Sequence, residues 1–289
     1  MRRREFLKSA RLMAGVPLLW KSAASHVWFY DDDAALCARK FEFAVSARLR
    51  EKPINEVIVE MGKTFLDTEY VAHTLEQPGE ERLVINLRGL DCVSFCENSL
   101  VLARCIKKAK TTFDQYKAEL QFIRYRGGVI DRYPSRLHYF SDYIFDNEKK
   151  GVWKNVTTSI GGVPFRKTIN FMSTHPDSYP QLKQHPEFFT IIQQQEEAIS
   201  KRAMVHIPKR EIARVADKIQ SGDVIGITSD IPGMDIAHTG IAIRQNGDLH
   251  FMHAPITGSK VMITTKTLAE YLTDNKKQLG IMVARPLEP

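Results

Sequence analysis

The 289-residue sequence lacks several features that would set it apart from ordinary globular proteins. It has no internal repeat and no low-complexity segment. Beyond its N-terminus it has no apolar run that approaches the length needed to span a bilayer. These absences exclude a repeat protein, a disordered chain and a protein with several membrane spans. Hydrophobic residues make up 43% of the chain, which is ordinary for a folded domain.

Cysteine is also scarce, with four residues at positions 37, 92, 96 and 105. No Cys-x-x-Cys pair occurs, so the spacing fits no common zinc site. An exported protein could pair such residues in disulfides. Free cysteine is among the most buried residue types, and we interpret Cys37, Cys96 and Cys105 as structural thiols.

The N-terminus has the pattern of an export signal. Arg3–Lys8 contains twin arginines, Leu12–Trp20 is a modest apolar stretch, and Ser22–Ala24 offers small residues for cleavage. The apolar stretch is too short for a permanent membrane helix. We predict that residues 1–24 are a twin-arginine signal peptide and that the mature protein is periplasmic. The alternative is a basic amphipathic helix that stays on the protein.

The positive charge of the chain belongs mostly to this segment. The full sequence carries a net charge of +7, but residues 1–24 hold six Lys/Arg and one acidic residue. The mature part is therefore close to +2, and its bulk charge predicts neither a nucleic-acid nor a membrane partner.

The first two thirds of the mature chain are mainly helical in pattern. A strand is expected at residues 83–87, followed by a helix over 92–110. Helical spacing returns over 112–123, and a hairpin is expected around Gly161-Gly162.

The last third has a different character. Strands are expected at 222–228, 236–244, 249–254 and 279–285, and Asn246-Gly247 is a strong hairpin-turn pattern. Helices followed by antiparallel strands predict an α+β fold, with a helix packed on the sheet.

Cys92 is the candidate nucleophile. It stands at the expected start of the 92–110 helix, where free backbone N–H groups favour a thiolate. Asp91 precedes it and suits a helix N-cap. The alternative, a core cysteine, fits poorly beside an aspartate at a helix start.

Two histidines could complete a hydrolytic site. His238 lies in an apolar strand and is the candidate base. The predicted hairpin brings His253 next to it, where it could orient the imidazole. Either residue alone could instead be a histidine satisfied within the core.

These residues lie in motifs that resemble the NlpC-type papain-like cysteine hydrolases of the cell wall. The shared motifs are Asp91–Phe95, Gly222–Val224, His238–Ile241 and His253-Ala254. The sequence is closer still to the N-acetylmuramoyl-L-alanine amidase-like branch, through the segments Ile123–Gly128, Ser135–Asp142, Phe171–His175, Ile207–Lys209 and Met234–His238. Cys96 departs from the pattern, because an apolar residue such as Val is usual there, and a redox reaction between Cys92 and Cys96 stays open.

The resemblance implies a papain-like core with Cys92, His238 and His253 as a Cys–His–His site. It also implies one catalytic domain over 25–289, with a large helical insertion at about 107–210. No metal and no cofactor is expected.

Substrate contacts are expected from the same motifs. Peptidoglycan fragments carry carboxylates, and the planar fork of arginine binds carboxylates with two hydrogen bonds. The candidates are Arg124, Tyr125, Arg126, Arg136, Tyr139 and Asp235. The alternative is that the arginines are surface residues and the tyrosines core residues.

Three functions compete at this point. The leading one is a periplasmic amidase that cuts between N-acetylmuramic acid and L-alanine, in intact murein or its fragments. The second is an endopeptidase that cuts the stem peptide between D-Glu and diaminopimelate. The third is a metal-binding or non-catalytic wall protein built on Cys92, His238, His250 and His253.

Overall fold

The structure, a computed structural model, describes residues 24–289, with side chains from Asp32 onward. The predicted signal peptide thus falls almost wholly outside the described residues. Each helix in the described part is too short or too polar to cross a membrane. From Asp33 to Pro289 the chain forms one compact unit, within which the expected insertion lies.

The helices of the described chain are mostly in its first 200 residues. They are α1 (Ala24–Ser46), α2 (Ile54–Lys63), α3 (Cys92–Lys107), α4 (Phe113–Arg124), α5 (Phe140–Lys149), α6 (Phe171–Thr174), α7 (Pro180–Gln184), α8 (Pro186–Ser200), α9 (Ile212–Val215) and α10 (Leu268–Thr273). Thr112 caps α4 with a capping box, which confirms the helix expected there.

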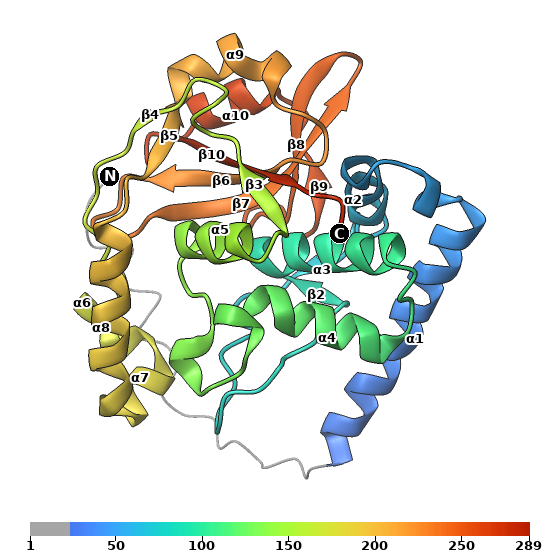
Figure 1. The fold of residues 1–289 in the computed structure, drawn as a ribbon, viewed down its shortest axis with the longest axis horizontal. Coiled ribbons are helices and arrows are strands. Elements are labelled where there is room, and N and C mark those ends of the chain that lie inside the picture. The colour runs from blue at the N-terminus through green and yellow to red at the C-terminus, as the bar shows by residue number, and fades with distance from the viewer. Residues whose placement is uncertain (1–23) are drawn as a thin grey trace. The chain divides into compact units, whose positions relative to one another are not determined.

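The strands form a small parallel pair and one large antiparallel sheet (Figure 1). The pair is β1 (Glu69–Tyr70) with β2 (Gly89–Leu90). The sheet has the order β4-β5-β10-β6-β7-β8-β9, with β3 also beside β10. Its strands are β3 (Trp153–Asn155), β4 (Val163–Pro164), β5 (Val205–Pro208), β6 (Val224–Ser229), β7 (Ile236–Gln245), β8 (Asp248–His253), β9 (Met262–Ile263) and β10 (Gln278–Pro286). The predicted mixture of helices and antiparallel strands is therefore confirmed.

Both faces of the central strands are buried, because successive side chains point to opposite faces. Val224 and Ile241 face the core that α2 and α3 build. Ile225 and Ala242, one residue further along, face a second core with α9 and α10. This packing holds β6, β7 and β10 rigidly between two helical layers.

A third apolar cluster lies entirely within the segment expected as an insertion. Its members come from residues 133–199 and include Tyr133, Tyr139, Phe188 and Ile192. The segment therefore has a core of its own beside those of the sheet.

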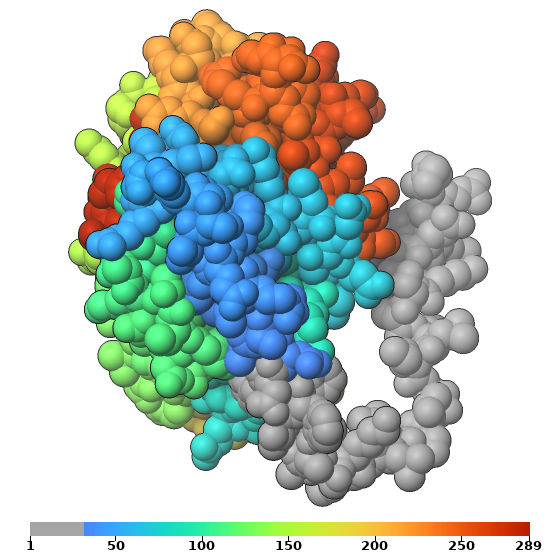
Figure 2. Space-filling model, turned by 90° about the vertical axis from the view of Figure 1, so that its right-hand side faces the viewer, coloured from blue at the N-terminus to red at the C-terminus, as the bar shows by residue number. Residues whose placement is uncertain are grey.

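The strand expected at 83–87 is wrong. These residues belong to no strand, and their backbone groups bond to side chains instead. The Leu87 N–H donates to Asp33 Oδ1 at 3.0 Å, and the Asn86 carbonyl accepts from Asn98 Nδ2 at 3.0 Å. From Asp33 onward α1 therefore packs alongside the segment that leads to Asp91 (Figure 2).

The hairpin expected around Gly161-Gly162 is also wrong. Strands β3 and β4 flank these glycines but do not pair with each other. β3 pairs with β10, and β4 pairs with β5. Gly161 and Gly162 instead end a turn in which the Gly162 N–H donates to Thr157 O at 2.9 Å. Each of these two strands pairs with a strand that is distant in sequence, and a local turn pattern cannot reveal such pairing.

Candidate active site

The start of α3 is built around Asp91. Asp91 Oδ1 accepts the Ser94 N–H at 2.8 Å, and the Asp91 N–H donates to Ser94 Oγ at 2.9 Å. This reciprocal pair is a capping box, which satisfies two backbone donors at the helix start. Cys92 is consequently fixed as the first residue of the helix, as its sequence pattern predicts.

The Cys92 thiol is half-buried, and its surroundings favour the protonated form. Burial raises its pKa to about 12, and the Asp91 carboxylate adds to the rise. Backbone N–H groups of Thr239, Cys92 and Val93 act in the opposite direction, but they do not outweigh burial. Burial first, and then the aspartate that caps the helix, therefore oppose the resting thiolate expected from the helix start. A base is needed to remove the proton.

Cys92 lies against the strand that carries the candidate base. The Thr239 backbone N–H is near enough to the Cys92 sulfur to lower its pKa, and Cys96 Sγ is 3.7 Å from Thr239 Oγ1. Thr239 directly follows His238 on β7, and α3 packs across this strand (Figure 1). The fold thus joins residues 92 and 238, which are far apart in sequence.

The two histidines form a direct pair. His238 Nε2 is 2.7 Å from His253 Nδ1, and the ring planes are nearly perpendicular. The predicted β7–β8 hairpin is confirmed, with Asn246 and Gly247 in left-handed conformations at its turn. The pairing of β7 with β6 also shifts register at Ala237, and such irregularities often re-aim a side chain beside a site.

Both imidazoles are neutral over the ordinary pH range. Burial lowers the pKa of His238 to about 4. Burial and the neighbouring His238 lower the pKa of His253 to about 3. A neutral imidazole has a free lone pair on one nitrogen, so the pair can accept a proton from a thiol.

Two tyrosines that the sequence did not single out also lie near the sulfur. Burial, followed by the charges of Cys92 and Asp91, raises the pKa of Tyr70 to about 12. Tyr70 arrives through the β1–β2 pair, whose second strand leads directly to Asp91. Tyr271, on α10, meets the His253 ring edge to face at 5.2 Å, and Cys92 contributes to the rise in its pKa. Neither position has a local sequence pattern that could have revealed it.

An open cleft of about 490 Å³ adjoins the histidine pair. Its lining includes His238, His253, Tyr271 and Gln278, and two lysines, Lys266 and Lys277. Among the described lining residues there is no aspartate and no glutamate. The cleft therefore suits a ligand that carries negative charge.

Arg124 and Tyr125, two predicted substrate contacts, have partners inside the fold. Arg124 is buried, and its Nη2 and Nε lie 2.7 and 3.0 Å from Glu97 Oε2 on α3. The buried Tyr125 hydroxyl donates to Glu81 Oε1 at 2.8 Å. Their burial favours a structural role, and contact with substrate stays a prediction.

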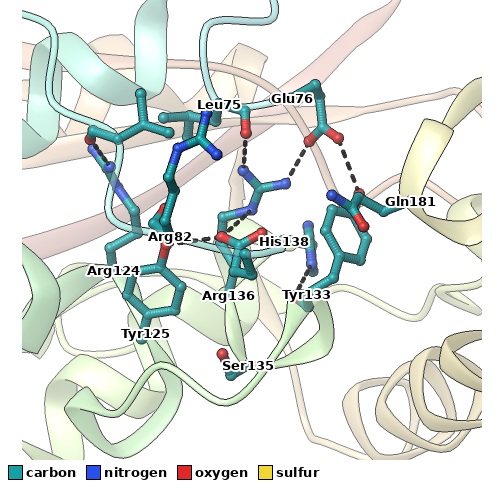
Figure 3. A network of polar contacts seen from close by, with 12 residues as sticks. Leu75, Glu76, Arg82, Arg124, Tyr125, Tyr133, Ser135, Arg136, His138 and Gln181 are labelled. Atoms are coloured by element: carbon teal, nitrogen blue, oxygen red, sulfur yellow. Dashed lines mark hydrogen bonds and ion pairs between the residues drawn. The ribbon is translucent and has the colours of Figure 1, made fainter. Parts of the chain in front are cut away.

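Arg136 sits at the centre of a polar network (Figure 3). Its Nη1 donates to Leu75 O at 2.6 Å and its Nη2 to Glu76 Oε1 at 2.5 Å. Its Nε lies 3.7 Å from Glu81. Arg136 thereby ties the segment before the nucleophile helix to the helical segment after it.

The other three residues predicted to contact substrate also have hydrogen-bond or ion-pair partners within the protein. Arg126, which is half-exposed, pairs with Asp142 at 2.6 Å. The buried Tyr139 hydroxyl donates to Glu196 at 2.5 Å. Asp235 accepts the Ser141 N–H at 2.7 Å, and burial raises its pKa. None of the six predicted contacts is among the described lining residues of the cleft.

The metal-binding alternative needs at least three ligands close together. Among the side chains that the structure describes, from Asp32 onward, no three His, Cys, Asp or Glu residues gather where they could hold an ion. His250 of the metal-binding alternative is directed elsewhere, with its Nδ1 3.0 Å from Thr264 O.

Comparison with known proteins places this geometry in a family. An N-acetylmuramoyl-L-alanine amidase from Bacteroides uniformis ATCC 8492 is 37% identical, with a TM-score of 0.77, over 81% of this chain and 98% of that chain. A Bacteroides fragilis protein, whose name proposes a xylanase, is 36% identical, with a TM-score of 0.71, over 78% of this chain and 99% of that chain. A Legionella pneumophila protein at 20% identity and a TM-score of 0.68 shares the fold over 90% of this chain and 96% of its own.

No curated protein matches the sequence. The family model for AmiA-like, N-acetylmuramoyl-L-alanine amidase-like proteins matches residues 60–281, which include α3 and both histidines. The chain therefore belongs to the N-acetylmuramoyl-L-alanine amidase-like family.

Proposed function

We propose that this protein is an exported cysteine hydrolase that cleaves the amide between N-acetylmuramic acid and L-alanine in peptidoglycan. The observation that carries the proposal is the His238–His253 pair at 2.7 Å, whose first member lies on β7, the strand against which the Cys92 helix α3 packs. A nucleophile at a helix start on an antiparallel sheet is the arrangement of a papain-like core. The family membership supplies the substrate class.

The proton transfer follows from the tautomers that the pair allows. His238 can accept the Cys92 proton on Nδ1 only if its Nε2 carries a hydrogen. The Nε2–H group of His238 then donates to His253 Nδ1. Because Nδ1 of His253 is the acceptor, neutral His253 carries its own hydrogen on Nε2. His253 thus fixes the tautomer of the base and supports the imidazolium that forms.

The thiolate attacks the lactyl carbonyl carbon of the muramic acid. The Cys92 N–H and the Tyr70 hydroxyl are the candidate donors to the oxyanion. The carbon–nitrogen bond breaks as His238 returns its proton to the leaving amine of L-alanine, which leaves a thioester on Cys92. Water, deprotonated by His238, then hydrolyses the thioester and regenerates the thiol.

Digestion of purified muropeptides with mass analysis tests this proposal. The expected products are a free N-acetylmuramic acid sugar and an intact stem peptide that begins with L-alanine. A sugar that keeps L-Ala-D-Glu, with release of a peptide that begins with diaminopimelate, would establish the endopeptidase instead. Zinc at one equivalent per chain, with activity lost to a chelator, would replace the cysteine mechanism by a metal-dependent one.

Xylan is included as a control substrate, because of the Bacteroides fragilis relative. Glycosidases generally need two carboxyl groups flanking the scissile bond. The described lining of the cleft has no carboxylate, and we expect no release of xylo-oligosaccharides.

The periplasmic location is part of the proposal and rests on Arg3 and Arg4. Replacing both by lysine should retain the precursor in the cytoplasm, as measured by cell fractionation. Unchanged export of this variant would remove the twin-arginine route.

A further inference from the structure

Gln278 occupies an irregular position at the edge of the cleft. It begins β10 and faces Ser229 on β6, but the register shifts between Gln278 and Gly280. A bulge of this kind turns a side chain away from the direction that the pleat would give it. The Gln278 side chain lines the cleft together with His238 and His253.

The side chain is buried, yet one of its polar atoms is unused. Gln278 is 6% exposed, and within the described residues its Oε1 has no hydrogen-bond partner. Its side chain also lies near Tyr271, where it opposes the rise in that tyrosine's pKa. A buried acceptor without a partner is uncommon in folded proteins and calls for an explanation.

The surroundings indicate what could satisfy this acceptor. A carbonyl oxygen accepts hydrogen from an N–H or O–H donor. Lys266 and Lys277 line the same cleft and attract carboxylates, while Lys266 also pairs with Asp274 on the exposed side. A peptide that carries both amide N–H groups and carboxylates matches both features.

We propose that Gln278 is a substrate-binding residue, whose Oε1 accepts a hydrogen bond from a backbone N–H of an anionic peptide held in this cleft. The inference rests on the proposed function and deepens it, because the stem peptide of a muropeptide is such a ligand. The free protein keeps the acceptor unpaired, and the bound peptide pairs it.

The first test compares Gln278→Met with Gln278→Glu in muropeptide hydrolysis. Met has a similar shape and no acceptor, whereas Glu keeps one. Because the bond exists in both the ground state and the transition state, Gln278→Met should raise KM about tenfold with kcat nearly unchanged. Gln278→Glu keeps the acceptor but brings a negative charge toward an anionic peptide, so it should recover only part of this loss. An unchanged KM in Gln278→Met, or a fall in kcat alone, would overturn the inference.

Thermal unfolding separates binding from a structural role. Loss of the unpaired Oε1 should not lower the Tm, and loss of the interaction with Tyr271 should lower it only slightly, so the Tm of Gln278→Met should change little. Gln181 is the matched control, because it is equally buried but its Nε2 donates to Gly79 O at 2.6 Å and to Gln77 O at 3.2 Å. Gln181→Met should therefore lower the Tm. A marked drop in the Tm of Gln278→Met would assign it a structural role.

A third measurement is independent of turnover. Stem peptides in which one amide N–H at a time is replaced by an ester oxygen are titrated against the wild-type protein and Gln278→Met. One replacement should weaken binding to the wild type about tenfold and leave binding to the variant unchanged. Equal losses in both proteins at every position would refute the contact. Binding that follows this pattern without amide cleavage would overturn the proposed function and keep the role of Gln278.

Discussion

The helical segment that follows α3 and the cleft use polar side chains for different purposes. In the helical segment, buried charges meet partners, as Arg124 meets Glu97 and Arg136 meets Glu76. In the cleft, His238 and His253 pair with each other, and no aspartate or glutamate is among the described lining residues. Unpartnered buried polar atoms occur in both regions. The comparison teaches that buried ion pairs hold the helical segment in place, while the cleft keeps an uncharged imidazole pair available to act as a base.

The largest expected effect comes from removing the sulfur. Cys92→Ala should reduce kcat by at least about 10⁴-fold, because the proposed thioester cannot form without the Cys92 sulfur. The Tm should change little, since alanine is tolerated at a helix start and the Asp91–Ser94 capping box remains. Muropeptide turnover and thermal unfolding measure the two effects. Retained turnover would remove Cys92 from the mechanism.

The histidines should differ in importance. His238→Ala removes the proposed base, and we expect a loss of about 10³-fold in kcat. His253→Ala removes the residue that fixes its tautomer, and the loss should be about tenfold smaller. Steady-state kinetics of both variants at one pH make the comparison. The reverse order would exchange their roles.

Substitutions in the ion pairs of the helical segment should lower the free energy of unfolding and leave the chemical step unchanged. Arg124→Met leaves Glu97 buried without its partner, and we expect a loss of about 3 kcal/mol in the free energy of unfolding. The double variant Arg124→Met, Glu97→Leu should regain most of it, because both charges are gone. Urea denaturation gives the values.

The same double variant tests the substrate role that the sequence predicts for Arg124. If it unfolds like the wild type but its KM for muropeptides rises more than about tenfold, Arg124 binds substrate. An unchanged KM would assign the arginine to the fold alone.

The depressed histidine pKa values predict acid sensitivity of stability. The pKa of His238 is about 4 in the folded protein, against roughly 6.5 in the unfolded chain. Between these two pH values the unfolded chain binds more protons than the folded protein. The free energy of unfolding therefore falls as the pH drops from about 6.5 to about 4, and above about pH 6.5 this loss is absent. We expect His238 to account for about 2 kcal/mol of the loss. Denaturation of wild type and His238→Asn at pH 4.5 and 7.5 should show a weaker pH dependence in the variant.

The smallest effect is expected at Cys96. It is buried beside Thr239, and valine has a similar volume. Cys96→Val should change the free energy of unfolding by less than about 1 kcal/mol and leave kcat within about twofold. A larger loss of activity under reducing conditions would show that this sulfur takes part in the reaction.

The sequence predicted the parts of the site that have local patterns. Asp91 marks a helix start, and Asn246-Gly247 fixes the hairpin that brings His253 to His238. These patterns, together with the family resemblance, led to the three residues to which we assign the chemistry, and their catalytic roles stay predictions. The resting protonation of Cys92 was wrongly predicted, because it depends on burial, which a sequence does not display.

The parts that were missed depend on contacts between distant segments. Tyr70 reaches the sulfur through a two-residue parallel pair, and Gln278 lines the cleft because of a bulge. The expected strand at 83–87 fails because side chains from α1 and α3 take its backbone groups. None of these contacts leaves a periodic pattern in the sequence.

The capping carboxylate of Asp91 has a consequence for the durability of the enzyme. Peroxide and other oxidants attack the thiolate far faster than the thiol. We expect Asp91, by adding to the effect of burial in keeping Cys92 protonated, to shield the sulfur from irreversible damage in the proposed periplasmic location. The residue that starts the helix would thus also prolong the working life of the proposed nucleophile, which in our mechanism reacts only after a neighbouring imidazole takes its proton.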